Sequence, residues 1–448
     1  MSSSGSVCVK EAVLIPPSEP TPNHTLRLSA LDSQLFLRFT FEYLLVYEPR
    51  ASVDRAALAQ NCKAGLGRAL VPYYPLAGRV RKRPEGGGLE VVCRAQGAVF
   101  IEAVSGSTVA EFAGAPRRGG AQWRKLLSVH VEDVLQGAPP LVVQMTWLSD
   151  GGAALAAGFN HCLCDGVGSG EFLKVFAELA AGESGISELN PQPTWNRHLL
   201  DPPSPIRSGR VNFKPGSHPE FRPVPDVSEF AARYAEERMI PTCITYDENG
   251  IKDLKKLSRS PPAQTTSFEA VAGHVWRSWS RSLRLPANQI VKLLFTINVR
   301  QRVSPNLPSG YYGNAIVLGC AEARAADLAE KGLEHAAELV RRAKERVGDA
   351  YVREVVECVS SGGGAGIVDL VGALVLTQWT TLGLDTLDFG MGRPLHVGPL
   401  CYDRYCMLSP APATGRRRAV KVSLAVPATA VDDYLYFLRN PQRQCQRR

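Results

Sequence analysis

HCLCDG, residues 161–166, lies where the sequence changes from the pattern of a strand to that of a helix. The preceding ALAAGFNH is an apolar run typical of a buried strand, and it places His161 at the end of that strand. The following GVGSGEFLKVFAELAAG has apolar residues at the three-to-four spacing of an amphipathic helix. We therefore expect this loop to join a strand to a helix, with Gly166 allowing the tight turn that starts the helix.

Short strands and helices alternate irregularly on both sides of this loop, which predicts a mixed α/β fold. PLVVQMTWL is expected to be a buried strand joined to ALAAGFNH by a turn at residues 149–152. The other expected strands are FEYLLVYEP, LEVVCRAQGAVFIEAV, VKLLFTINVRQR, YCMLSPA and AVKVSLAV, the last two closing the chain across a basic loop. Further helices are expected at residues 249–257, 267–283 and 324–346.

Prolines concentrate between residues 189 and 226, where they exclude long helices and central strands. We interpret residues 191–226 as an extended crossover between an N-terminal domain, residues 1–190, and a C-terminal domain, residues 227–448. A chain of 448 residues is long enough for two domains of ordinary size.

The composition is that of a soluble globular protein, with 45% hydrophobic and 21% charged residues. No apolar run reaches membrane-spanning length, and no secretory signal is recognisable, so we expect a cytoplasmic protein. The eleven cysteines form no C-x-x-C pair, which favours reduced thiols over disulfides or a zinc site. We expect no metal site, because no second histidine lies at metal-ligand spacing from His161.

The net charge of +8 is compatible with an anionic partner. Nucleic acid is not expected, because the basic clusters at residues 79–83 and 416–418 lack interleaved aromatic residues. The glycine-rich stretch at residues 362–366 is not a phosphate cradle, because no Lys-Ser/Thr pair follows it. A nucleotide-bearing small molecule fits the mild excess of positive charge.

His161 is a candidate general base, because an imidazole accepts a proton from an alcohol or amine near neutral pH. Asp165 could form an ion pair with a buried arginine; Arg300 and Arg302 would share one face of the strand VKLLFTINVRQR. A histidine at a strand end is also often structural, and a Cys-His nucleophile pair with Cys162 or Cys164 is a weaker alternative. The residues of this one motif leave these readings open.

Four further stretches carry a resemblance. HCLCDG, together with TLDFGMGRP at residues 386–394, resembles the H-x-x-x-D-G and D-F-G-W-G signatures of the plant BAHD family of CoA-dependent acyltransferases. VPYYPLAGRV at 71–80, TTSFEAVAGHVWRSW at 265–279 and NVRQRVSPNLPSGYYGNAI at 298–316 resemble other segments of that family, in the same order. The resemblance covers nearly the whole chain.

This resemblance implies two α/β domains like those of chloramphenicol acetyltransferase, with a channel between them. Acyl-CoA would enter as co-substrate from one side and a small acceptor from the other, with no permanently bound cofactor and a monomeric chain. His161 would be the general base for direct attack of the acceptor on the thioester, without an acyl-enzyme. Thr377 and Trp379 would lie near the developing oxyanion, and Asp165 would be a structural residue paired with an arginine.

The resemblance also implies roles away from the reacting atoms. Lys255, Lys256 and Ser267 lie where family members contact CoA. Asp388, Gly390 and Gly392 would shape a loop, in which Met391 replaces the family's tryptophan. A flexible thioether can fill the space of the missing indole, so we expect Met391→Trp to be tolerated.

The substrates are harder to predict. Asp388-Phe389-Gly390 departs from the Y-F-G-W-G of malonyl-specific relatives, so we do not expect an anionic acyl donor. Thr381 stands where shikimate and quinate transferases carry an arginine for the acceptor carboxylate, so we expect an uncharged acceptor. We expect a hydroxycinnamoyl, benzoyl or aliphatic acyl group and a neutral alcohol. The alternatives are an amine acceptor, a non-catalytic partner protein, and a peptide-synthetase condensation domain, which would carry a second histidine where Asn160 stands.

Overall fold

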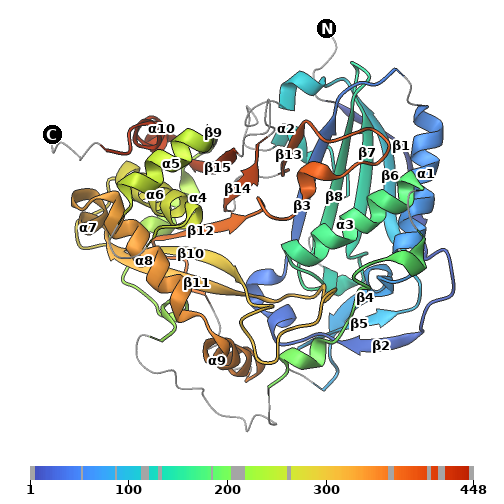
Figure 1. Cartoon of the computed structure of the whole chain (residues 1–448), viewed down its shortest axis with the longest axis horizontal. Helices are drawn as coiled ribbons and strands as arrows, with labels where there is room; N and C mark the ends of the chain where they lie inside the picture. Colours follow the sequence, from blue (N-terminus) through green and yellow to red (C-terminus); the bar gives the residue numbers. More distant parts are fainter. Residues whose placement is uncertain are drawn as a thin grey trace.

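The computed structural model describes residues 6–51, 54–85, 88–112, 121–129, 134–182, 185–202, 217–259, 264–361, 368–400, 405–411 and 419–442. This part of the chain forms two six-stranded sheets, with α-helices packed beside them, and one three-stranded sheet (Figure 1). The mixed α/β fold predicted from the sequence is confirmed. The glycine-rich stretch 362–366 and the basic cluster 416–418 lie outside the described residues.

The first sheet holds the strand that leads to His161. Its order is β1 (Val7–Ile15), β6 (Ala98–Ser105), β7 (Leu141–Trp147), β8 (Ala153–Asn160), β3 (Thr40–Tyr47) and β13 (His396–Pro399). All neighbours are antiparallel except β6 and β7. The predicted turn between β7 and β8 is confirmed, since Leu148 N donates to Gly152 O at 2.9 Å.

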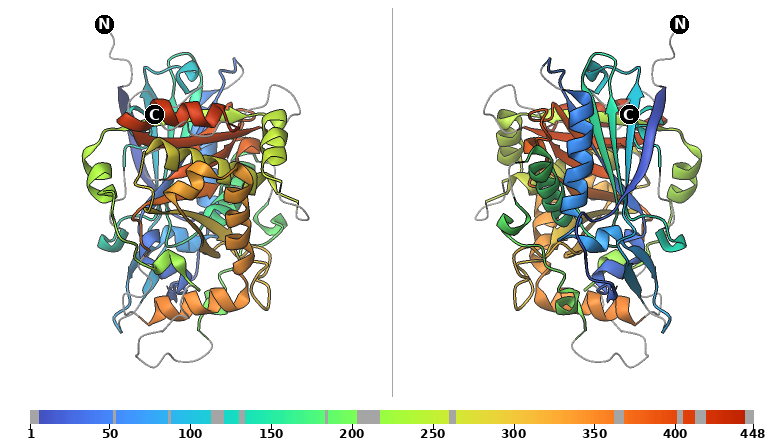
Figure 2. Two further views of the ribbon diagram at one scale, coloured as in Figure 1. Left: turned by 90° about the vertical axis from the view of Figure 1, so that its left-hand side faces the viewer. Right: turned by 90° about the vertical axis from the view of Figure 1, so that its right-hand side faces the viewer.

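Two helices pack together outside this sheet: α1 (Arg55–Ala69) and α3 (Gly166–Ala181), which face the viewer in the right-hand view of Figure 2. Their close approach depends on Gly65, because a Cβ there would lie 2.7 Å from the backbone of Ala180. The small sheet consists of β2 (His24–Arg27), β5 (Leu89–Cys93) and β4 (Arg79–Lys82), in that order. A short helix, α2 (Ala121–Arg124), lies between β6 and β7 in the chain.

The second sheet has the order β11 (Ile316–Arg324), β10 (Ile290–Asn298), β12 (Ala373–Gln378), β14 (Cys406–Pro410), β15 (Val420–Pro427) and β9 (Met239–Tyr246). Its outer helices face the viewer in the left-hand view of Figure 2. They are α4 (Phe230–Glu236), α5 (Glu248–Leu257), α6 (Ser267–Ser282), α7 (Ala325–Glu330), α8 (Leu333–Arg346), α9 (Asp349–Ser360) and α10 (Val431–Arg439). The central α6 packs against α5, α8 and α10.

One strand from the second half of the chain joins the sheet of the first half. β13 comes from the second half of the chain but pairs with β3 at the edge of the first sheet (Figure 1). Phe389 and Met391, which precede it, belong to the hydrophobic core of the first sheet. The domain boundaries at residues 190 and 227 stay a prediction, but residues 389–399 pack with the first half.

Four expectations from the sequence were wrong in detail. The strand VKLLFTINVRQR ends at Asn298, because the chain turns directly afterwards, with Arg302 N donating to Val299 O at 2.9 Å. The helix expected at 324–346 breaks into α7 and α8 at Gly332, a residue of low helix propensity. LEVVCRAQGAVFIEAV forms two strands, separated at Ala95 and Gly97 by positive φ angles. A helix, α10, follows the last strand.

The described parts of the predicted crossover contain short 3₁₀ helices at Arg197–Leu200 and Pro219–Phe221 and an isolated β-bridge from Thr194 to Tyr311, but no α-helix or sheet strand, as the prolines require. Every cysteine in the described ranges is free, and seven of these nine are buried. Within the same ranges, no helix has both the length and the apolar character needed to cross a membrane.

Candidate active site

His161 directly follows the last residue of β8, at the predicted junction of strand and helix. Its backbone N donates to Phe39 O at 2.9 Å, which ties it to the segment leading into β3. Its imidazole lies between the rings of Phe39 and Phe41, with centroid distances of 5.4 and 4.6 Å. The ring is therefore held by packing as well as by hydrogen bonds.

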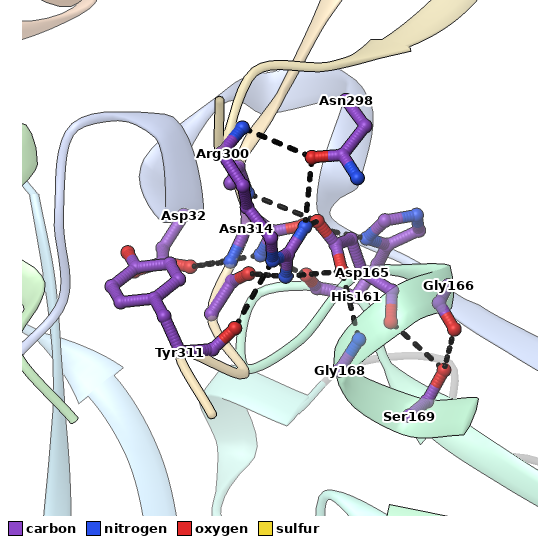
Figure 3. A network of polar contacts seen from close by, with 12 residues as sticks. Asp32, His161, Asp165, Gly166, Gly168, Ser169, Asn298, Arg300, Tyr311 and Asn314 are labelled. Atoms are coloured by element: carbon purple, nitrogen blue, oxygen red, sulfur yellow. Dashed lines mark hydrogen bonds and ion pairs between the residues drawn. The ribbon is translucent and has the colours of Figure 1, made fainter. Parts of the chain in front are cut away.

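The side chain of Asn314 determines which imidazole nitrogen carries the proton (Figure 3). Asn314 Nδ2 donates to the carbonyl of His161 at 2.6 Å, so the amide oxygen is the end that faces His161 Nδ1, at 3.0 Å. That oxygen can only accept, so Nδ1 carries the proton and Nε2 is the unprotonated nitrogen. Among the described residues, Nε2 has no hydrogen-bonding partner.

Burial lowers the pKa of His161 below its usual value, against the opposing effects of its hydrogen bonds and of Asp165 and Asp32. The neutral ring therefore predominates at neutral pH. A neutral imidazole with a free Nε2 can accept a proton.

A cavity of about 460 Å³ lies between the two sheets and is bordered by His161. The first half of the chain contributes lining residues from 36–41 and 165–167. The second half contributes residues of β10 and β11, residues from 368–382, which include β12, and Tyr405. Most of these side chains are apolar. A second cavity of about 370 Å³ shares Leu370, Val375 and Tyr405 with the first, so the two adjoin.

Thr377 and Trp379 both line the cavity with His161, although they lie more than two hundred residues later in the chain. Thr377 is on β12, where its Oγ1 lies 3.4 Å from Thr296 Oγ1. Trp379 packs its ring against Tyr43, with centroids 4.6 Å apart. Thr381 lines the same cavity.

Asp165 is fully buried, and each of its carboxylate oxygens accepts two hydrogen bonds (Figure 3). Oδ1 accepts from Arg300 Nη2 at 2.9 Å and from Gly168 N at 3.0 Å. Oδ2 accepts from Arg300 Nη1 at 2.8 Å and from Ala315 N at 3.0 Å. Burial alone would raise the pKa of Asp165, but Arg300 and the N–H donors hold it below the usual value.

The predicted arginine partner is therefore Arg300. Arg302 lies elsewhere, because its Nη1 donates to the carbonyls of Lys344 and Val347, both at 2.8 Å. The strand ends before either arginine, so the alternation that placed them on one face does not apply.

Gly166 does not provide the tight turn that the sequence analysis expected of it. It is the first residue of α3, after the N-cap Asp165, and its φ is not in the left-handed region. What a side chain there would meet is Leu382 Cδ1, 3.3 Å from an added Cβ. The indispensable glycine is Gly168, since an added Cβ would lie 1.9 Å from the carbonyl oxygen of Tyr312.

Asp388 organises its loop as expected. Its Oδ1 accepts from Gly390 N at 2.8 Å and from Gly392 N at 2.7 Å. Both glycines have positive φ, +92° and +81°. Met391 between them is only 4% exposed, which leaves little room for an indole.

Lys255, Lys256 and Ser267 do not line the two cavities described above. The lysines are in the last turn of α5, and Lys256 Nζ bonds to Asp253 Oδ1 at 2.9 Å. Ser267 is the exposed first residue of α6. A hydrogen bond from Thr265 to the carbonyl of Ser258 ties these two helix ends together, so the three residues share one region.

Sequence reasoning assigned no role to Asn314 or Gly168. Asn314 stands in the quoted GYYGNAI, but its partner His161 is 153 residues away, so spacing could not reveal the contact. Gly168 could have been suspected as a glycine in the first turn of an amphipathic helix. The described residues contain no cluster of histidine, cysteine and acidic side chains suited to a metal ion.

Comparisons with known proteins agree with the fold and the motifs. Residues 6–433 match the model of the Transferase family. The omega-hydroxypalmitate O-feruloyl transferase of Arabidopsis thaliana is 32% identical over 431 residues, which cover 94% of this chain and 90% of that protein.

Two solved structures share the fold. Vinorine synthase matches with a TM-score of 0.74 at 20% identity, covering 98% of this chain and 99% of that one. TRI101 of F. graminearum, in complex with coenzyme A and T-2 mycotoxin, matches with a TM-score of 0.74 at 15% identity, covering 91% and 96%. The chain belongs to the Transferase family, the plant BAHD acyltransferases that its motifs resemble.

Proposed function

We propose that this enzyme transfers an aromatic acyl group, such as hydroxycinnamoyl or benzoyl, from CoA to the hydroxyl of a small neutral acceptor. One observation carries the proposal: His161 borders the cavity between the sheets with Nδ1 held by Asn314 and Nε2 unpaired among the described residues. That is the arrangement a general base needs.

In the proposed reaction, Nε2 of His161 takes the proton of the acceptor hydroxyl as its oxygen attacks the thioester carbonyl. Thr377 and Trp379 border the same space and offer donors to the oxyanion, each worth roughly 3 kcal/mol if aligned. The C–S bond then breaks, and the imidazolium returns its proton to the CoA thiolate. No acyl-enzyme forms, because the acceptor is itself the nucleophile.

Several observations support these substrates. The cavity is lined mainly by apolar side chains, which suit an aromatic or aliphatic acyl group, and Thr381 offers no charge for a carboxylate. The Arabidopsis relative is named as an O-feruloyl transferase, which fits an aromatic donor. We further propose that the two adjoining cavities form the channel, that Lys255, Lys256 and Ser267 contact CoA, and that the protein is a cytoplasmic monomer.

The test is a panel of acyl-CoA donors crossed with alcohols and amines, with products identified by mass spectrometry and free CoA measured in parallel. We expect ester products from an aromatic donor. His161→Gln should lower turnover roughly 100-fold or more while the melting temperature stays close to that of the wild type. Amide products would favour the alternative of an amine acceptor.

Two outcomes would contradict the proposal. Near-normal turnover in His161→Gln would remove the general base. No CoA release with any donor would favour a non-catalytic partner protein.

A further inference from the structure

Behind Asn314 lies a fully buried carboxylate, Asp32, in the short 3₁₀ helix at Leu31–Ser33. Its Oδ1 accepts from both the backbone N of Asn314, at 2.9 Å, and the side-chain Nδ2, at 2.8 Å. Its Oδ2 accepts from Ser29 N at 3.0 Å and Ser29 Oγ at 2.8 Å. Arg197 Nε lies 2.9 Å from the same oxygen and forms an ion pair with it, without the alignment of a hydrogen bond. The carboxylate is therefore surrounded by N–H and O–H donors and one positive charge.

Arg197 comes from the proline-rich crossover and is itself buried. Its Nη2 donates to the carbonyl of Leu163, inside the HCLCDG loop, at 2.8 Å. Its guanidinium lies 4.0 Å from the centre of the Trp195 ring. The space for it depends on Gly313, where an added Cβ would lie 2.3 Å from Arg197 Cζ. The chain thus makes specific room for this cation beside the catalytic loop.

We propose that Asp32, paired with Arg197, is a positioning residue that fixes the orientation of the Asn314 amide and, through it, the tautomer of His161. A flipped Asn314 would place its carbonyl oxygen against Asp32 Oδ1 and the carbonyl of His161, both acceptors. With the amide in its present orientation, Nδ1 must donate and Nε2 stays unprotonated. This inference rests on the proposed function of His161, but the tautomer can be measured without any substrate.

Asp32→Asn is the direct test. An asparagine has one acceptor oxygen where the site needs two, so its NH₂ must face either the Ser29 and Arg197 donors or Asn314. The single oxygen should stay with the Ser29 donors and the Arg197 charge, so the NH₂ faces Asn314. The Asn314 amide then flips and presents its NH₂ to His161 Nδ1, which favours the opposite tautomer. The turnover should then fall between roughly 100-fold and 10,000-fold, the range for a misplaced or wrongly protonated base.

The decisive measurement is ¹⁵N NMR of the imidazole nitrogens in the full chain. The His161 signals, among those of eight histidines, are identified by their loss in His161→Gln. In the wild type we expect a protonated Nδ1 and an unprotonated Nε2. In Asp32→Asn we expect a mixture or the reverse.

Asp32→Asn leaves Arg197 buried without an opposite charge, so the double variant Asp32→Asn/Arg197→Gln is measured as well. Removing both charges should recover stability while the tautomer stays altered.

Glu220→Gln is the matched control, since Glu220 is a buried carboxylate bound to His218 and Tyr351 and does not line the cavity. It should lower the melting temperature and leave the His161 signals unchanged.

A wild-type tautomer in Asp32→Asn, or in the double variant if the single one does not fold, would overturn the inference even if turnover fell. If the tautomer changes as expected but the wild type transfers no acyl group, the proposed function fails and the positioning role stands.

Discussion

Arg300 and Asp165 form a two-point ion pair between the two halves of the chain, with nitrogen-to-oxygen distances of 2.8 and 2.9 Å. Asp165 caps α3 in the first half of the chain, whereas Arg300 follows β10 in the second. Since both carboxylate oxygens are occupied by these bonds and by backbone donors, we infer that the motif aspartate joins the two halves and takes no proton from the substrate.

Asp165→Asn should destabilise the protein by about 3 kcal/mol or more, because Arg300 would be left largely buried without its partner. Activity should fall with it, since Ala315 and Gly168 lose an anchor near His161. Chemical denaturation measures the free energy of unfolding. The matched control is Asp433→Asn, which breaks an exposed pair with Arg284 and should cost under about 1 kcal/mol.

Unchanged stability with lost activity in Asp165→Asn would instead make Asp165 a direct catalyst. The effect should also depend on pH. The folded pKa of Asp165 lies below its unfolded value, so its contribution is fully present above about pH 4 and is lost as pH falls through the folded pKa. The stability difference between wild type and variant should therefore shrink in acid.

The pH dependence of kcat/KM should report the lowered pKa of His161. The neutral ring is the active form, so the rate should be constant at neutral pH and fall as pH drops through the pKa. Because burial lowers that pKa, the acidic limb should lie below about 6.5, the usual value for histidine. A limb above that value would contradict the buried environment of His161.

Gly168→Ala should destabilise the protein by about 3 kcal/mol and reduce activity, because the new Cβ would overlap the carbonyl oxygen of Tyr312. Relief of that overlap would displace α3 from residues 312–314 and so disturb Asn314. The melting temperature and kcat report the two effects. Gly106→Ala is the matched control, since nothing lies within 4 Å of its added Cβ.

Lys256→Ala should raise the KM for acyl-CoA about fivefold and leave the acceptor KM unchanged, if Lys256 contacts a CoA phosphate with the strength of an exposed ion pair. Steady-state kinetics with each substrate varied separately will distinguish the two constants. Lys252→Ala is the control on the same helix, where Lys252 pairs with Glu248 at 2.7 Å. Unchanged donor KM in both Lys255→Ala and Lys256→Ala would remove this role.

Thr381→Arg should give the enzyme measurable activity with acceptors that carry a carboxylate. Thr381 is exposed and lines the cavity, so an arginine there has room to form a bidentate pair with that group. The ratio of kcat/KM for a carboxylated alcohol to that of its methyl ester should rise about tenfold. No change in the ratio would mean that the acceptor binds away from Thr381.

Much of the local structure could be predicted from neighbouring residues. The turn at 149–152, the strand leading to His161 and the helix after it follow from patterns that span a few residues. The end of the strand at Asn298 could not be predicted in this way, because the following turn is held by distant segments: Arg300 binds Asp165, and Arg302 binds the carbonyls of Lys344 and Val347. The break at Gly332 did have a local signal, the glycine itself, but the apolar spacing continues across it.

The sequence by itself determined the family, the mixed α/β class and His161 as the candidate base, because these depend on motifs whose order and spacing are fixed along the chain. Only the tertiary structure showed that Arg300, and not Arg302, pairs with Asp165. It also showed that position 168, and not 166, has no room for a side chain. Finally, it placed Asn314, Asp32 and Arg197 behind His161. Hydrogen bonds and close packing act over about 3–4 Å in space whatever the separation along the chain, so a contact between residues 161 and 314 leaves no local pattern in the sequence.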